Sequence, residues 1–191
     1  GMEQLASLLE KAEAQYLGCN IRYTGTGDSA VSSLKPYEIV SYGDTDVAFV
    51  GVSTPESIAK STPSYFMDES GGFVYDFYGG SGEELYARVQ ETVDECREEG
   101  ADYVIALAHL GDDEASKPFR STDLIAGTTG IDAVLDGHSH SVLPCDVVEN
   151  KEGDKVLLSS TGTGLANIGQ MVITADGNLA AGLIGDFPDR N

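Results

Sequence analysis

The sequence predicts an α/β fold in which helices alternate with the strands of a mostly parallel sheet. Two segments, "DYVIALAHL" (102–110) and "DAVLDGH" (132–138), are nearly continuous apolar runs, typical of strands that are buried on both faces. The segment "STDLIAGTT" (121–129) lies between them and begins with the polar residues that cap a short helix. The 191 residues are enough for one such domain with a full hydrophobic core.

The N-terminal part is predicted to contain one helix and three strands. Apolar residues recur at helical spacing over residues 3–16, which predicts an amphipathic helix. The segment "GCNIRY" (18–23) is a short strand candidate, and "YEIVSYGDTDVAFVGV" (37–52) is typical of two strands joined by a Gly-Asp turn. Thr54 and Pro55 end the second strand, because proline cannot donate to a sheet.

A loop and a long helix are expected next. Residues 59–82 are rich in serine, glycine, proline and aromatic residues, which favours an excursion loop. Ser81 is followed three residues later by Glu84, a capping box that predicts the start of a helix. This helix is expected to run to about Glu99 and to end at Gly100.

The C-terminal part is predicted to consist of strands. The segment "KVLLSS" (155–160) is one strand, and "QMVITADGNLAAGLI" (170–184) resembles a hairpin around Asp176 and Gly177. The glycine spacing in "STGTGLANIG" (160–169) fits neither the dinucleotide-binding fingerprint nor the phosphate-binding loop. We therefore interpret it as a turn between strands.

The charge balance narrows the classes of partner. The chain has 11 basic and 32 acidic residues and a formal net charge of −21. So few basic residues cannot form a patch for a nucleic-acid polymer, and an anionic membrane surface is disfavoured as well. An anionic substrate would also be repelled, unless a bound cation reversed the local sign of the charge.

The cysteines and the hydropathy pattern indicate neither disulfide bonds nor a membrane span. Cys19, Cys96 and Cys145 show no close metal-binding spacing and are odd in number, so we expect free thiols. No run of about 18 apolar residues exists, so no membrane span is predicted. The segment "GMEQLASLLEKAEAQ" (1–15) lacks the basic start and apolar stretch of a signal peptide, so the chain shows no targeting signal.

The chain's three histidines stand at the ends of the two apolar runs. His109 follows one predicted strand, and His138 and His140 follow the next. Because the carboxyl ends of parallel strands meet at one sheet edge, the three imidazoles are expected to converge. On an extended segment, the H-x-H spacing points both rings to the same side, and Gly137 allows a sharp turn or a close approach. We predict a metal site; three unrelated polar loop residues are the alternative.

The residues around His138 and His140 also partly match the active-site motif of a serine hydrolase. The segment "GHSHS" (137–141) nearly matches the G-x-S-x-G nucleophile elbow, with Ser139 as the nucleophile. Ser141 replaces the final glycine, however, and no histidine follows His140 to serve as the base. This alternative is therefore disfavoured.

Three aspartates near the histidines have two interpretations each. Asp112 and Asp113 follow His109 closely and either support an imidazole N–H or belong to a solvated loop. Asp136 either orients His138 or is an ordinary residue at the end of a strand.

The residues around the histidines resemble a known family. "GADYVIALAHLG" (100–111) followed by "GIDAVLDGHSHS" (130–141) strongly resembles the calcineurin-like metallophosphoesterase domain of bacterial 5′-nucleotidases. That group also contains UDP-sugar hydrolases and 2′,3′-cyclic-nucleotide phosphodiesterases. "VAFVGVSTPES" (47–57) and "LGCNI" (17–21) resemble further elements of the family, so the resemblance covers essentially all of residues 1–191.

The resemblance implies a fold and an activity. The fold is a metallophosphatase-type α/β/β/α sandwich, and the activity is metal-dependent hydrolysis of nucleotide phosphoesters by an extracellular, periplasmic or cell-surface phosphatase. His109 and His138 correspond to ligands of one divalent ion and His140 to a ligand of a second, such as Zn²⁺ or Mn²⁺. In the family, a water activated by two metal ions attacks phosphorus.

The family's first-half motifs D-x-H, G-D-x-x-D and G-N-H-E are not found in the chain. Residues 1–191 are therefore expected to form the second half of a catalytic domain, an incomplete sandwich that lacks the transition-state histidine and is inactive alone. Its exposed apolar strands predict self-association. The alternative is a non-catalytic remnant that acts as a binding or interaction module.

Overall fold

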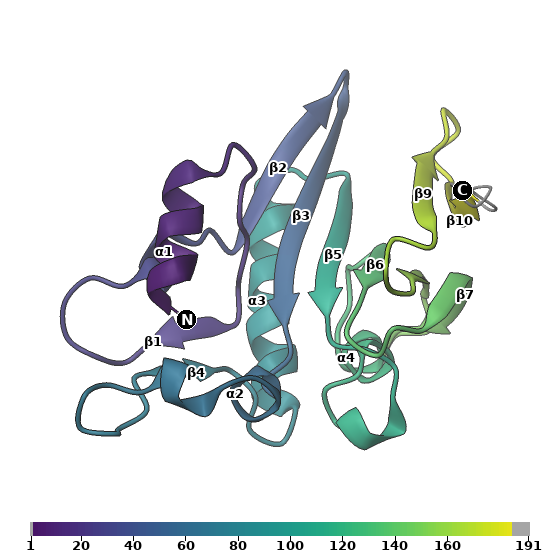
Figure 1. Ribbon diagram of the computed structural model, residues 1–191. Coiled ribbons are helices and arrows are strands. Elements are labelled where there is room, and N and C mark those ends of the chain that lie inside the picture. The colour runs from purple at the N-terminus through teal and green to yellow at the C-terminus, as the bar shows by residue number, and fades with distance from the viewer. Residues whose placement is uncertain (1, 185–191) are drawn as a thin grey trace, which may run out of the picture.

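A six-stranded sheet forms the centre of the molecule (Figure 1). The computed structural model describes residues 2–184. The strand order is β2-β3-β5-β6-β8-β7; β3, β5, β6 and β8 run parallel, and the edge strands β2 and β7 are antiparallel to their neighbours. The strands are β2 (Tyr37–Tyr42), β3 (Thr45–Ser53), β5 (Tyr103–His109), β6 (Ala133–Asp136), β7 (Val142–Glu149) and β8 (Lys155–Thr161). The predicted α/β class is confirmed.

Helices and two small antiparallel sheets surround this sheet. The small sheets pair β1 with β4 and β9 with β10. None of the helices between residues 2 and 184 combines the length and the apolar character that crossing a membrane requires. These elements are α1 (Met2–Lys11), α2 (Ser57–Lys60), α3 (Glu83–Glu98), α4 (Ser121–Gly127), β1 (Ile21–Tyr23), β4 (Tyr75–Phe77), β9 (Ile168–Ile173) and β10 (Leu179–Ile184), with short 3-10 helices η1 (Ala30–Ser33), η2 (Pro63–Phe66) and η3 (Glu114–Ser116).

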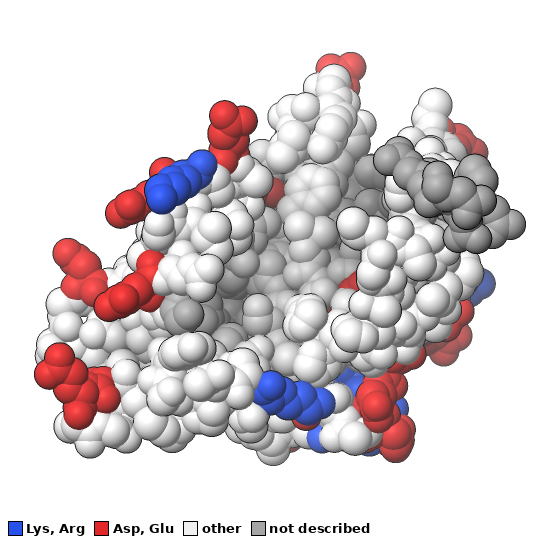
Figure 2. Space-filling model, in the orientation of Figure 1, with Lys and Arg blue, Asp and Glu red and all other residues white. Residues whose placement is uncertain are grey.

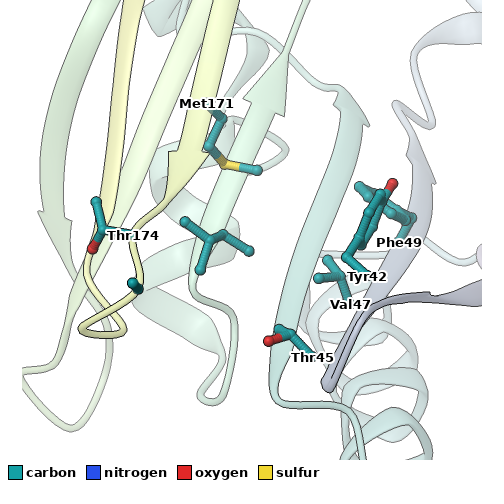
Figure 3. Close-up of a pocket in the computed structure, with 8 residues that line it drawn as sticks. Tyr42, Thr45, Val47, Phe49, Met171 and Thr174 are labelled. Carbon is teal, nitrogen blue, oxygen red and sulfur yellow. The ribbon is translucent and has the colours of Figure 1, made fainter.

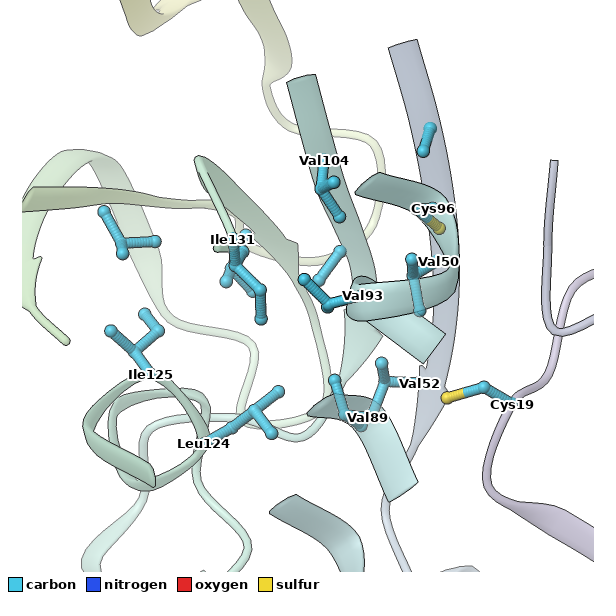
Figure 4. Packing of buried hydrophobic residues seen from close by; sticks show 14 of the residues in the cluster. Cys19, Val50, Val52, Val89, Val93, Cys96, Val104, Leu124, Ile125 and Ile131 are labelled. Atoms are coloured by element: carbon cyan, nitrogen blue, oxygen red, sulfur yellow. The ribbon is translucent and has the colours of Figure 1, made fainter. Parts of the chain in front are cut away.

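The main hydrophobic core lies between the sheet and the helices α3 and α4. Leu85, Val89 and Val93 on α3 and Leu124 on α4 are fully or almost fully buried against strand residues such as Val104 (Figure 4). Strand side chains alternate between the two faces, so every second residue of β3, β5 and β6 contributes to this core. Burial of these side chains is the main favourable term that fixes the sheet.

The opposite face of the sheet is only partly covered. Val47, Ile105 and Ala133 form a small second core, against which Met171 of β9 and Leu179 of β10 pack. Leu107 on the same face of β5 is 40% exposed. Parallel strands normally bury both faces, yet in Figure 2 this face is hollowed between β3 and β9. The face is called the open face below.

Two helix boundaries differ from the sequence prediction. The first helix ends at Lys11 instead of residue 16, because the chain turns away so that Leu17 can form a parallel bridge with Lys35. The predicted capping box at Ser81 is wrong: α3 begins at Glu83, and its N-cap is Gly82, whose φ of 99° suits glycine and which makes no side-chain cap bond. The predicted end at Gly100 is confirmed by its φ of 98°.

The other differences are elements that the sequence patterns do not show. The predicted loop 59–82 contains the end of α2, η2 and β4, all of which are too short to give a periodic signal. The edge strand β7 was not predicted, because it contains Pro144 and most of its side chains are exposed. The short helix α4 is present, but its N-cap is Arg120 instead of a serine or threonine, and the backbone N–H of Arg120 donates to the Asp123 carboxylate.

The strands at the C-terminal end follow the prediction. The hairpin predicted over 170–184 is confirmed as β9 and β10, with Gly177 at a φ of 84° in its turn. The glycine-rich segment 160–169 is confirmed as a connection between β8 and β9, and Gly162 and Gly164 adopt positive φ angles in it.

Candidate metal centre

The sheet topology brings two histidines together at one edge. His109 is the last residue of β5, and His138 follows β6 by two residues. Because β5 and β6 are adjacent and parallel, their carboxyl ends lie side by side. The rings of His109 and His138 face each other edge-on, with 5.0 Å between their centroids and 67° between their planes. This pair is called the histidine pair below.

The third histidine is placed differently from the expected geometry. The expectation of an extended H-x-H segment is wrong, because His138 has a φ of 85° and His140 a φ of 59°. The chain therefore turns between them, and His140 is exposed to solvent. Within residues 2–184, no group of three or more histidine, cysteine or acidic side chains is arranged to hold a metal ion.

Sequence reasoning missed two charged neighbours of the histidine pair, Glu56 and Lys60. Glu56 Oε2 lies 3.4 Å from His138 Nε2 and 3.0 Å from Lys60 Nζ, and Lys60 Nζ lies 3.4 Å from His138 Nε2. Burial alone would raise the pKa of Glu56, but bonds from Ser116 and Lys60 outweigh it and lower that pKa. Glu56 follows β3, the parallel neighbour of β5, so the rule that located the histidines applies to it too.

The surroundings of His109 favour its neutral form. Loss of surrounding water lowers the pKa of the His109 imidazole, and the proximity of His138 lowers it further, against an opposing effect of Asp136. A neutral imidazole has the free nitrogen lone pair that a metal ion requires. The donor chemistry thus fits a borderline ion such as Zn²⁺, for which the pair could supply two of the four usual ligands.

The two loops that carry the histidines interlock through their glycines. A Cβ atom at Gly137 would lie 3.2 Å from His109 Nδ1, so this glycine leaves room for the ring of the other loop. A Cβ atom at Gly111, which has a φ of 78°, would lie 3.0 Å from Ser139 Oγ. Each loop therefore has a glycine at the point where a side chain of the other loop passes.

The aspartates bond to these loops, and none donates or accepts a bond at an imidazole. Asp136 accepts hydrogen bonds from the backbone N–H groups of Leu110 and Gly111 and from the Ser121 hydroxyl. Its alternative as a residue that orients the His138 ring is therefore wrong.

Asp112 bonds to the serines beside His140, and Asp113 caps a short helix. Asp112 accepts hydrogen bonds from the hydroxyls of Ser139 and Ser141, which lower the pKa of its carboxyl. Asp113 accepts from the Ala115 N–H at 2.9 Å, at the start of η3. Ser139 Oγ is thus engaged with an aspartate instead of a histidine, which argues against a hydrolase nucleophile at that position.

The chain is similar to phosphoesterases of known sequence and structure. The family of the bacterial capsule synthesis protein PGA_cap matches residues 2–166. Human 5′-nucleotidase is 31% identical over 149 residues, which are 75% of this chain and 22% of that protein. The chain therefore spans less than a quarter of the length of this relative.

Solved structures show the same fold. NAD nucleotidase from Haemophilus influenzae superposes with a TM-score of 0.72 at 20% identity, over 95% of this chain and 32% of that one. The calcineurin-like phosphoesterase YfkN from Bacillus subtilis superposes with a TM-score of 0.67 at 20% identity, over 96% and 58%. The predicted fold family is confirmed: the chain belongs to the family of the bacterial capsule synthesis protein PGA_cap and has the fold of a calcineurin-like phosphoesterase domain.

Proposed function

We propose that the chain carries part of the site of a metal-dependent phosphoester hydrolase that acts on nucleotides. In this proposal His109 and His138 bind one divalent ion and His140 contributes to a second. The histidine pair, 5.0 Å apart between ring centroids at the sheet edge, is the observation that carries the proposal. We also propose an extracellular, periplasmic or cell-surface location, on the resemblance to the 5′-nucleotidases.

The residues around the pair suit the handling of a phosphate. When bound, Zn²⁺ or Mn²⁺ supplies positive charge and lowers the pKa of water. A chain with a net charge of −21 would otherwise repel an anionic substrate. Lys60, whose side chain is 49% exposed, brings an ammonium group to the same edge of the sheet, where it is paired with Glu56 at 3.0 Å. We infer that its remaining N–H groups donate hydrogen bonds to the phosphate.

A second candidate function is a non-catalytic binding module. The observation that favours it is the lack of a three-residue ligand group within residues 2–184. A pair of imidazoles leaves the coordination of Zn²⁺ incomplete, because four ligands are usual. Under either candidate we expect poor hydrolysis by this chain alone.

Titration with Zn²⁺ and Mn²⁺ tests the proposed site. Calorimetry on the wild-type chain is expected to show binding that His138→Ala weakens strongly, while His140→Ala leaves the affinity of the first ion nearly unchanged. Assays with AMP and a chromogenic phosphodiester, with and without a chelator, measure activity. Equal affinity in the wild type and His138→Ala would contradict the metal site. Robust turnover that the chelator abolishes would contradict the expected inactivity and the binding module.

We further propose that the open face binds a second copy of the chain. A cavity of about 620 Å³ on this face is lined by uncharged residues only, and Figure 3 shows β3 and β9 on its two sides. The lining residues are Tyr42, Thr45, Val47, Phe49, Met171, Ile173, Thr174 and Ala175. Two chains that each carry a charge of −21 can approach with least repulsion through such a face. Burial of its apolar surface supplies the driving force.

Sedimentation over a dilution series tests this self-association. Leu107→Lys places a charge on the open face and is expected to shift the equilibrium to the monomer. Leu8→Lys on α1 is the matched control, because Leu8 is 49% and Leu107 40% exposed. A wild-type chain that stays monomeric at the highest concentration would show that no second copy binds there.

A further inference from the structure

The turn that carries His138 and His140 has a backbone that needs external support. Both residues have positive φ angles, 85° and 59°, in a region that side chains other than glycine seldom adopt. Such conformations persist only where the surrounding structure fixes them. Ser139 lies between the two histidines, so whatever holds Ser139 also holds the turn.

Asp112 supplies this support from the loop after His109. Its backbone N–H donates to Ser139 Oγ at 3.0 Å, and its carboxylate accepts from the hydroxyl of Ser139. The same carboxylate oxygen accepts from Ser141 Oγ at 2.6 Å. One residue thus fastens both serines that flank His140. Hydrogen bonds to a charged acceptor are stronger than neutral ones, which suits a support for a strained turn.

Asp136 supports the other loop in the reverse direction. It ends β6, and its carboxylate accepts from the N–H groups of Leu110 at 2.9 Å and Gly111 at 3.0 Å. These are the two residues that follow His109. The carboxylate also accepts from the hydroxyl of Ser121, the first residue of α4. Asp136 therefore fixes the backbone beside His109 to β6 and to the helix.

We propose that Asp112 and Asp136 are positioning residues that hold His109 and His138 in their facing arrangement. Each aspartate belongs to one histidine loop and bonds to the other loop, so the two loops form one cross-linked unit. The inference rests on the proposed role of the histidine pair as metal ligands. Its geometric part concerns only the distance between two rings, and that distance is measurable without metal.

The first measurement is made on the metal-free chain. Rings whose centroids are 5.0 Å apart give a nuclear Overhauser effect between their protons, and this signal reports the facing arrangement. Asp112→Ala and Asp136→Ala are both expected to abolish the signal, and Asp112→Ala is also expected to speed amide exchange in residues 138–141. Asp113→Ala is the matched control, because it removes the same charge one residue along, where the carboxylate only caps η3. Asp113→Ala is expected to change neither the Overhauser signal between the rings nor amide exchange in residues 138–141.

The second measurement is the affinity of the same variants for Zn²⁺. Loss of a residue that orients metal ligands lowers affinity by about 10- to 100-fold, and we expect at least tenfold for Asp112→Ala and Asp136→Ala. Asp112→Asn and Asp136→Asn keep an acceptor oxygen, and they are expected to restore most of the affinity and the ring signal. They also serve as test variants if either alanine protein fails to fold.

The outcomes separate the two proposals. An unchanged ring signal in Asp112→Ala and Asp136→Ala would overturn the positioning role, whatever the metal affinity. An equal loss of the signal in Asp113→Ala would overturn it as well, because charge alone would then explain the effect. A wild-type chain that binds no Zn²⁺ would contradict the proposed function, while the ring signal would still decide whether the aspartates hold the pair.

Discussion

Replacement of Gly111 by alanine tests whether the two histidine loops interlock. Gly111 has a φ of 78°, and a Cβ atom there would meet Ser139 Oγ at 3.0 Å and Ser139 N at 3.2 Å. Gly153 is the matched control, because its φ is 89° and nothing lies within 4 Å of its added Cβ. Both alanine variants adopt a left-handed backbone, but only Gly111→Ala also pushes against the other loop.

The expected losses of folding stability follow from the strain of the left-handed backbone and from the contact with Ser139. A left-handed backbone costs an L residue about 1–2 kcal/mol, so Gly153→Ala should lower the free energy of unfolding by about that amount. In Gly111→Ala, Ser139 must move, which weakens its bonds to Asp112; a hydrogen bond to a charged group contributes about 1.5–3 kcal/mol. We therefore expect Gly111→Ala to destabilise the chain by about 2 kcal/mol more than Gly153→Ala.

Urea unfolding followed by far-ultraviolet circular dichroism measures both variants, since the chain has no tryptophan. Unchanged slopes against urea concentration show that the two-state analysis holds. In a Ser139→Gly background, the extra cost of Gly111→Ala should fall to the level of the control. Equal destabilisation by Gly111→Ala and Gly153→Ala would refute the interlocked loops, because backbone strain alone would then account for both.

Two further predictions follow from the pKa shifts. Burial raises the pKa of Cys19 to about 12 and that of Cys96 to about 11, whereas Cys145 is exposed. Because the thiolate is the nucleophile, a thiol reagent at pH 8 should label only Cys145 in the native chain and all three cysteines in urea. Rapid labelling of more than one thiol in the native chain would contradict this prediction. A hydrogen bond from Arg120 lowers the pKa of the Asp123 carboxyl in the folded chain. The ionised carboxylate therefore stabilises the fold at pH values above the pKa that Asp123 has in the unfolded chain. This stabilisation is lost as the pH falls through the lower pKa of the folded chain. Urea unfolding of Asp123→Asn should therefore show destabilisation at pH 7 that shrinks toward pH 3, and a pH-independent difference would count against the ion pair.

The elements with strong apolar signals were predictable from sequence alone. The strands β5 and β6 are continuous apolar runs, and the helix α3 ends at a glycine with positive φ, so pattern and structure agree. The edge strand β7 was not predictable, because its exposed side chains show no regular pattern. The N-cap of α3 was misplaced by one residue, because a sequence pattern does not show that Gly82 has a positive φ.

The site was predictable in its location but not in its internal contacts. The rule that parallel strands share their carboxyl edge placed His109 beside His138, and the structure has them 5.0 Å apart between ring centroids. The expected extended geometry failed, because hydrogen bonds to Asp112 hold the segment in a turn. Such bonds depend on the spacing of two loops that lie about 27 residues apart in the chain, which no local pattern records.

The placement of the glycines beside the histidines has a structural cause that is separate from ligand approach. Gly111 follows His109 by two residues, and Gly137 precedes His138 by one, and each faces a side chain of the opposite loop. A larger residue at either position would move the partner loop and, with it, the histidine on that loop. The aspartates act on the same two loops by attraction, while the glycines act by the absence of a side chain. Hence the distance between the imidazoles depends on all four positions together, and their substitutions should combine non-additively.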